Sequence, residues 1–135
     1  MTFRADTFLR NVLLVDAATC VASGVLMTLG SGLIASLTAI PPALVLYAGL
    51  SLFPIAAFMT VTATRPVIPR PAVWLIIDGN VLWVAGSVWL MVGSAIAPNA
   101  LGHTFIGAQA VTVAILAALE YAGLRRHAPV SGMAS

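Results

Sequence analysis

Four long apolar stretches separated by short segments dominate the chain. They cover residues 11–29, 43–63, 71–92 and 103–124, and each is bounded by Gly, Pro, Ser or Arg. A helix needs about 20 apolar residues to cross the hydrocarbon core of a bilayer, where lipid offers no partner to exposed peptide groups. The pattern therefore predicts an all-α bundle of four transmembrane helices, forming one membrane domain over residues 1–135.

Two shorter segments lie outside these spans. Residues 33–40 place apolar side chains at helical spacing and stop at Pro41 and Pro42, which predicts a short surface helix or an extension of the first span. Residues 127–135 are small and polar, so we expect a flexible tail.

Composition supports a membrane protein. Hydrophobic residues make up 61% of the 135 residues and charged residues 7%, whereas a soluble domain carries roughly 25% charged residues. The first apolar run is long and opens a series of others, so we expect it to be retained rather than cleaved as a signal peptide. The single cysteine, Cys20, excludes a disulfide within one chain.

The arginines predict the orientation. The chain has no lysine, and its six arginines precede the first span, separate the second from the third, or follow the fourth: Arg4, Arg10, Arg65, Arg70, Arg125 and Arg126. Because positive residues stay on the cytoplasmic side, both termini are expected in the cytoplasm. The arginines form no basic stripe, so we expect membrane lipid and not nucleic acid as a partner.

Three carboxylates lie inside the predicted spans: Asp16, Asp78 and Glu120. An acidic residue within a membrane is costly and is by default a candidate functional residue. At a rise of about 1.5 Å per residue, Asp16 and Asp78 lie about 9 Å from the cytoplasmic ends of their spans and Glu120 about 6 Å. The sequence therefore predicts one shallow layer of carboxylates on the inner side.

Two interpretations of this layer are open. In the first, which the nearby arginines favour, it is a structural latch that bonds to charged, hydroxyl or amide side chains: Arg10, Arg65, Arg125, Thr60, Thr62, Asn80 and Gln109. In the second, the layer is a proton or cation site open to the cytoplasm.

Polar side chains share one face on two of the helices. The first helix carries Asp16, Thr19, Cys20 and Ser23, and the fourth carries Gln109, Thr112 and Glu120. Both faces should point into the bundle, where polar side chains can bond to neighbouring helices. On the third helix, Asp78 and Asn80 point to opposite sides, so at most one joins the layer. The alternative for Asn80 is a position facing a partner chain.

The fourth helix also carries small residues at strict intervals of four: Ala110, Ala114, Ala118 and Ala122. Such a stripe lets another helix approach closely. We expect it to pack within the monomer, and the alternative is a homodimer seam.

The first and third spans can be aligned as LLVDAATCVASGVLM and LIIDGNVLWVAGSVWLM. Both place Gly eight residues after Asp, in Asp16 with Gly24 and in Asp78 with Gly86. The two helical hairpins are therefore candidate parallel repeats related by an axis along the membrane normal. Chance resemblance between apolar segments is the alternative.

Sequence motifs for catalysis are missing. There is no P-loop, dinucleotide fingerprint, zinc-protease motif or serine-hydrolase motif. His103 and His127 lie at opposite ends of the fourth span and cannot bind one metal ion together. We therefore expect no catalytic residues, no metal, no cofactor and no enzymatic activity.

The segments LRNVLLVDAATCVASGVLM, GLSLFPIAAF, NVLWVAGS and GAQAVTVAILAALEYAGLRR resemble small bacterial four-helix membrane proteins without assigned function. The resemblance covers nearly the whole chain and implies a bacterial inner membrane. The chain is also similar in size and span count to the small multidrug resistance transporters, dimers that use a membrane glutamate in their first helix. Only Asp16 matches that role, as an aspartate nearer the cytoplasmic end and without the surrounding aromatic motifs.

These observations lead to two hypotheses of function. The first is a non-catalytic inner-membrane protein that serves as a subunit, assembly factor or interaction partner of a membrane complex. The alternative is a small proton-coupled transporter of hydrophobic or cationic solutes that uses the intramembrane carboxylates.

Overall fold

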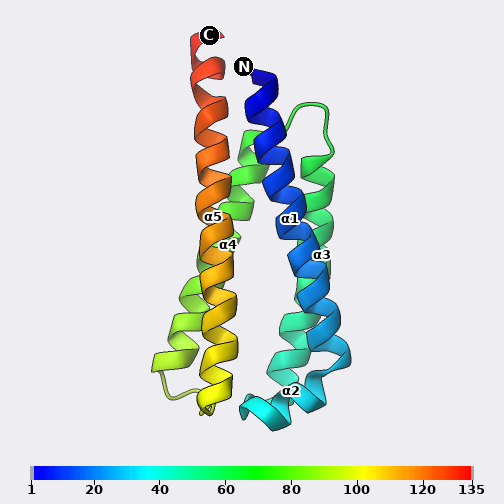
Figure 1. Cartoon of the computed structure of the whole chain (residues 1–135), viewed down its shortest axis with the longest axis vertical. Coiled ribbons are helices and arrows are strands. Elements are labelled where there is room, and N and C mark those ends of the chain that lie inside the picture. The colour runs from blue at the N-terminus through cyan, green and yellow to red at the C-terminus, as the bar shows by residue number, and fades with distance from the viewer. Residues whose placement is uncertain (1, 135) are drawn as a thin grey trace.

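Residues 2–134 form five helices and no strand (Figure 1). The computed structural model describes the backbone of residues 2–134 and the side chains of residues 7–126. The helices are α1 (Thr2–Leu29), α2 (Ser31–Thr38), α3 (Pro42–Ala63), α4 (Arg70–Val92) and α5 (Ala100–Ala134). All except α2 contain a stretch long and apolar enough to cross a membrane. This confirms the predicted all-α, four-helix transmembrane bundle.

Proline and a left-handed residue set several helix boundaries. Proline occupies the first turn of both α3 and α4, where its missing N–H costs no helical hydrogen bond. Helix α2 confirms the short helix predicted after the first span, and it ends at Ala39, whose φ of 59° turns the chain out of the helix. Helix α5 ends at Ala134, and the flexibility expected of residues 127–135 falls outside the residues described in full.

The bundle consists of two hairpins with unequal contacts. Helix α1 packs extensively against α3, α4 packs against α5, and α1 also contacts α5, whereas α3 and α4 barely touch. Both termini lie at one end, which we call the terminal end, and α2 lies across the opposite end (Figure 1). All described arginines lie near the terminal end, as the span boundaries require: Arg10, Arg65, Arg70, Arg125 and Arg126.

Two glycines bring α1 and α3 close together. A Cβ atom on Gly49 would lie 2.8 Å from the Cβ of Met27, and one on Gly24 would lie 3.1 Å from the carbonyl oxygen of Gly49. Small residues allow this approach between membrane helices, where van der Waals packing drives association. The proposed repeat pairs Gly24 with Gly86, but a Cβ on Gly86 would meet nothing within 4 Å. The aligned positions therefore differ in environment.

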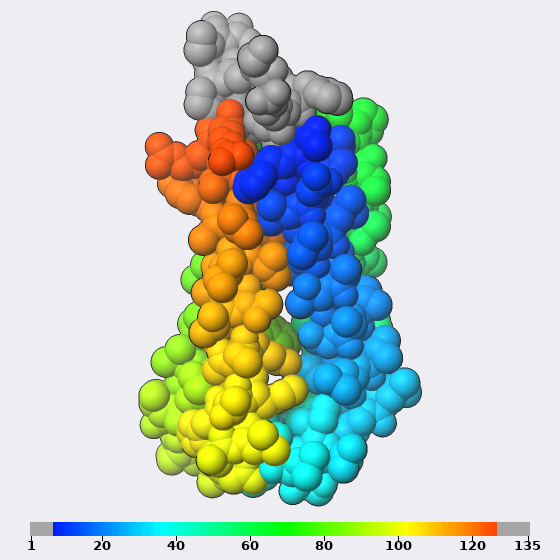
Figure 2. All heavy atoms as spheres, viewed as in Figure 1, coloured from blue at the N-terminus to red at the C-terminus, as the bar shows by residue number. Residues whose placement is uncertain are grey.

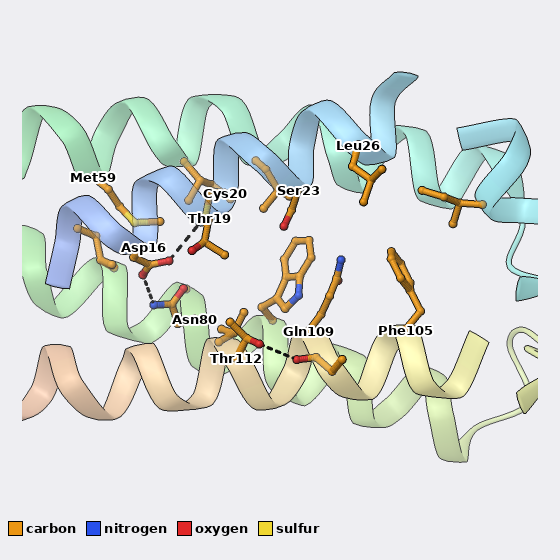
Figure 3. A pocket seen from close by; sticks show the side chains of 18 of the residues that line it. Asp16, Thr19, Cys20, Ser23, Leu26, Met59, Asn80, Phe105, Gln109 and Thr112 are labelled. Atoms are coloured by element: carbon orange, nitrogen blue, oxygen red, sulfur yellow. Dashed lines mark hydrogen bonds between the residues drawn. The ribbon is translucent and has the colours of Figure 1, made fainter. Parts of the chain in front are cut away.

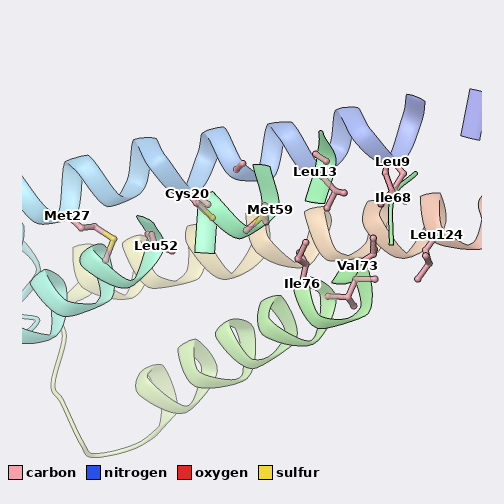
Figure 4. Close-up of a cluster of buried hydrophobic side chains, with 14 of the residues drawn as sticks. Leu9, Leu13, Cys20, Met27, Leu52, Met59, Ile68, Val73, Ile76 and Leu124 are labelled. Carbon is pink, nitrogen blue, oxygen red and sulfur yellow. The ribbon is translucent and has the colours of Figure 1, made fainter. Parts of the chain in front are cut away.

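The terminal end is closed by an apolar layer and by an arginine. Figure 4 shows buried side chains from α1, α4 and α5 meeting there, among them Leu9, Leu13, Val73 and Leu124, each no more than 1% exposed. Next to this layer, Arg10 donates from Nε to the carbonyl oxygen of Ala63 at 2.6 Å and from Nη2 to that of Arg65 at 2.8 Å. Together these contacts seal the space between the hairpins on that side.

Candidate functional site

Three polar side chains from three helices meet inside the bundle. The side-chain nitrogen of Asn80 on α4 donates to Asp16 Oδ2 on α1 at 3.0 Å and to Glu120 Oε1 on α5 at 2.8 Å. Asp16 is 1% exposed, Glu120 0% and Asn80 8%. We call these three residues the acidic cluster. Its two carboxyl groups share one hydrogen-bond donor within the span region.

The two carboxyl groups of the cluster are unequally satisfied. Asp16 Oδ1 also accepts a weak hydrogen bond from the Cys20 thiol at 3.8 Å. Glu120 Oε2 is buried and has no hydrogen-bond partner. A buried polar atom without a partner is rare in native proteins and often indicates a functional site or a missing ligand.

The sequence-based latch is wrong in its arginine and threonine partners, and of the partners expected it is Asn80 that bonds to the carboxyl groups. Within residues 7–126, none of the proposed arginine or hydroxyl groups bonds to Asp16, Asp78 or Glu120. The Thr60 and Thr62 hydroxyl groups donate to carbonyls one turn earlier in α3, as threonine often does within helices.

The three proposed arginines all lie toward the terminal end. Arg10 binds the carbonyl oxygens of Ala63 and Arg65, Arg65 itself is exposed, and Arg125 lies over the Tyr121 ring at 5.8 Å. Long arginine side chains extend toward the interface, and no cation of residues 7–126 bonds to the cluster.

The prediction for the third helix is also wrong. Asp78 is exposed on the outside of α4, and Asn80 occupies the place in the layer that Asp78 was expected to take. Residues two positions apart lie on opposite sides of a helix. The inward side of α4 is the one that carries Ile76 and Ile77, both 6% exposed, and Asn80 shares it. Asn80 therefore does not face a partner chain.

A cavity of about 890 Å³ extends from the acidic cluster toward α2. It lies between the α1–α3 and α4–α5 hairpins, and Figure 3 shows Asp16 and Asn80 at one end with Phe105 and Leu26 farther along. Its polar wall includes Asp16, Thr19, Cys20, Ser23, Asn80, Gln109 and Thr112. The polar faces predicted for the first and fourth helices thus line this space, except that Glu120 is not among its lining residues.

The cavity opens away from the terminal end. Figure 2 shows α1 and α5 in contact near that end and separated by openings toward α2. Leu37 and Thr38 of α2 and Leu101 of α5 line its far part, whereas the apolar layer of Leu9 and Leu13 closes the terminal side. Among residues 7–126, this cavity therefore does not open toward the arginine-rich end, as the second interpretation of the carboxylate layer had it.

No protein-family model matches this chain, and no curated protein or solved structure shows significant similarity to it. The argument about function therefore rests on the geometry of the cluster and its cavity.

The remaining predicted residues are divided between the cavity and the outer surface. Gln109 lines the cavity, and its side-chain nitrogen lies 3.4 Å from the sulfur of Met27. In the alanine stripe, Ala110 is buried and Ala122 half-buried, but Ala114 and Ala118 are exposed. An interval of four drifts by about 40° per step around a helix, so the whole stripe cannot pack within the monomer as expected.

Three aromatic residues of the cavity wall were missed in the sequence: Phe58, Trp83 and Phe105. Trp83 lies in the middle of the predicted span 71–92. The signal was present in its spacing, because Asn80, Trp83 and Ser87 follow at intervals of three and four and share a helical face. The wall therefore combines π faces with a carboxyl group.

The chemistry available in the cavity is that of an acid pair beside apolar and aromatic surfaces. Within residues 7–126, no three His, Cys, Asp or Glu side chains gather closely enough to hold a metal ion. The groups present can hold and release protons, attract a cation, and contact an apolar or aromatic body.

Proposed function

We propose that this protein is a small proton-coupled carrier of hydrophobic organic cations. The observation that carries the proposal is the cavity of about 890 Å³ that ends at two carboxyl groups with no arginine beside them. A structural latch would have its carboxylates neutralised by arginine, and a packed scaffold would have no such space.

The size and lining of the cavity support an organic ligand. Binding sites for small molecules usually measure about 300–1,000 Å³ and combine apolar walls with a few polar groups. Trp83 and Phe105 offer ring faces, which attract cations through their quadrupoles, and Asp16 supplies a carboxyl group at the closed end. A cation with an apolar body fits all three features.

The arginine distribution supports a bacterial inner membrane with both termini in the cytoplasm. In that orientation the cavity opens toward the outer leaflet and is closed on the cytoplasmic side by the apolar layer. A carrier requires a second state in which this layer separates and the opposite end closes.

Uptake by reconstituted vesicles tests the carrier. We expect vesicles containing the protein and a pH gradient to accumulate tetraphenylphosphonium, and the Asp16→Asn and Glu120→Gln variants to lose most of this uptake. The Asp78→Asn variant is the matched control, because it makes the same change from carboxyl to amide at a position outside the cavity. Wild-type uptake no greater than that of empty vesicles would contradict the proposal.

One observation favours the other hypothesis, a subunit or interaction partner of a membrane complex. Asp78 is exposed on the outer wall of α4 inside a candidate span, and a carboxylate facing lipid is costly. A neighbouring membrane protein with a basic or hydrogen-bonding side chain at that depth would cover it.

The same two sets of variants separate the hypotheses. If the subunit hypothesis holds, Asp78→Asn should change the size of the complex extracted in mild detergent, while Asp16→Asn should not. Loss of cation uptake in Asp16→Asn together with an unchanged complex in Asp78→Asn would reject the subunit and retain the carrier.

A further inference from the structure

The Asp16 and Glu120 carboxyl groups converge on one nitrogen atom, and no cationic side chain of residues 7–126 bonds to either. Both accept from Asn80 Nδ2, at 3.0 Å and 2.8 Å, and both are at most 1% exposed. Two ionised carboxylates held this close and away from water repel one another, so such pairs retain a proton between them. A proton shared in this way would leave the pair with one negative charge.

The groups around the cluster leave the proton as its only means of neutralisation. Helix α1 contributes Asp16 and the Cys20 thiol, α4 contributes Asn80, and α5 contributes Glu120. Helix α3 faces them with Met59, which is apolar and fully buried.

The nearest arginines are already bonded elsewhere. Arg10 binds the carbonyl oxygens of Ala63 and Arg65, and Arg70 donates to that of Leu124 at 3.2 Å. These contacts lie at the level of the apolar layer, which includes Leu9 and Leu124, and neither guanidinium group bonds to the carboxyl pair.

The two carboxyl groups have different access to a ligand. Asp16 lines the cavity, whereas Glu120 is not among its lining residues. Glu120 Oε2 is buried and accepts no hydrogen bond. A cation that enters from the cavity meets Asp16 first, and its charge favours loss of the proton from the pair.

We infer that the acidic cluster releases one proton for each monovalent hydrophobic cation that binds, an inference that rests on the proposed carrier function. The O–H bond of the shared proton breaks, the proton leaves to water, and the electron pair of that bond stays on the carboxyl oxygen that held the proton. One positive charge enters and one leaves. A divalent cation would need a second carboxylate in the cavity, and Glu120 is not among the residues that line it.

Calorimetry with the purified full chain in detergent tests this exchange. Tetraphenylphosphonium is titrated at one pH into buffers of different ionisation enthalpy, and the slope of the apparent enthalpy gives the number of protons released. We expect about one proton for each bound cation. Tetraphenylborate, which has the same shape and the opposite charge, should not bind.

Two variants test whether the released proton comes from the Asp16–Glu120 pair. Asp16→Asn should weaken tetraphenylphosphonium binding at least tenfold. Glu120→Gln should still bind tetraphenylphosphonium, but the number of protons released should fall toward zero. The remaining carboxylate, Asp16, then has no second acid with which to share a proton, and it keeps its donors Asn80 and Cys20. Release of one full proton by Glu120→Gln would overturn the shared proton.

The wild-type result separates failure of this inference from failure of the carrier. Binding of tetraphenylphosphonium with release of no proton, or of two, would overturn the one-for-one exchange and leave the carrier standing. Absence of any binding to the wild-type protein would overturn the proposed function itself.

Discussion

Asn80 and Asp16 are separated by 64 residues in the chain and by 3.0 Å in space. Their hydrogen bond joins α4 to α1, and the second bond of Asn80, to Glu120, joins α4 to α5. One neutral amide thus holds two acidic side chains from different helices at the closed end of a cavity. This relationship makes Asn80 a structural part of the candidate site and not a surface residue.

Replacing Asn80 should destabilise the bundle. Asn80→Leu keeps the volume but removes the donor to both carboxyl groups, and each buried group left without a partner costs about 1–3 kcal/mol. Thermal unfolding in detergent, followed by circular dichroism, measures the loss. Asn11→Leu is the control, because Asn11 is exposed on α1 and surface changes usually stay within about 0.5 kcal/mol. Equal melting temperatures for the two variants would contradict the role of Asn80.

Gly49 should not tolerate a side chain. Gly49→Ala places a Cβ atom 2.8 Å from the Cβ of Met27, so α1 and α3 must separate, at a cost of about 1–3 kcal/mol. Gly86→Ala meets nothing within 4 Å and should be neutral or stabilising by up to about 1 kcal/mol, since alanine favours the helix. Denaturation in mixed micelles compares the pair. A loss in Gly86→Ala as large as that in Gly49→Ala would argue against the close α1–α3 contact.

Arg10 should not be replaceable by lysine. Its guanidinium group reaches two carbonyl oxygens at the end of α3 at once, a geometry that a single ammonium group does not reproduce. We expect Arg10→Lys to cost about 1 kcal/mol and to speed hydrogen exchange in the last turn of α3. Arg126→Lys, at an exposed position over the Phe8 ring, should change neither. Identical hydrogen exchange in Arg10→Lys and wild type would show that the two hydrogen bonds of Arg10 do not stabilise the last turn of α3.

Cys20 offers a native reporter of the cavity, because it is the single cysteine of the chain and lines the space next to Asp16. In vesicles of known orientation, a small membrane-impermeant thiol reagent should label Cys20 only from the side opposite the termini. A double substitution, Leu9→Ala with Leu13→Ala, thins the apolar layer and should raise labelling from the terminal side several-fold. Equal labelling of the wild type from both sides would contradict the closed terminal end, and Cys20→Ser gives the background.

The sequence predicted the helices better than their faces. Apolar length located four spans within a few residues of their observed bounds, because any helix in lipid must satisfy its own peptide groups. The sequence placed Asp78 in the carboxylate layer, and the structure places Asn80 there instead. The helical period had shown only that the two side chains point in opposite directions. Depth and charge favoured Asp78, and only the packing of Ile76 and Ile77 reveals which side of α4 turns inward.

Arginine placement shows the same division. The positions of the arginines correctly predicted which end of the bundle each connecting segment lies at. Both hairpins start and finish at the terminal end, where the arginines are. It also suggested arginine partners for the carboxylates, which the structure contradicts. Proximity along the chain does not measure distance across the bundle, and the apolar layer of Leu9, Leu13 and Leu124 separates the two kinds of charge.

The sequence by itself therefore determined the class of protein, the number of spans, the end of the bundle that carries the positive charge, and the polar faces of two helices. These features follow from local periodicity and from the demands of lipid on any single helix. The tertiary structure alone decided that Asn80 joins Asp16 to Glu120, that no arginine neutralises them, and that a cavity opens away from the terminal end. Those features depend on how the α1–α3 hairpin packs against the α4–α5 hairpin, and the sequence of one helix alone does not specify that packing.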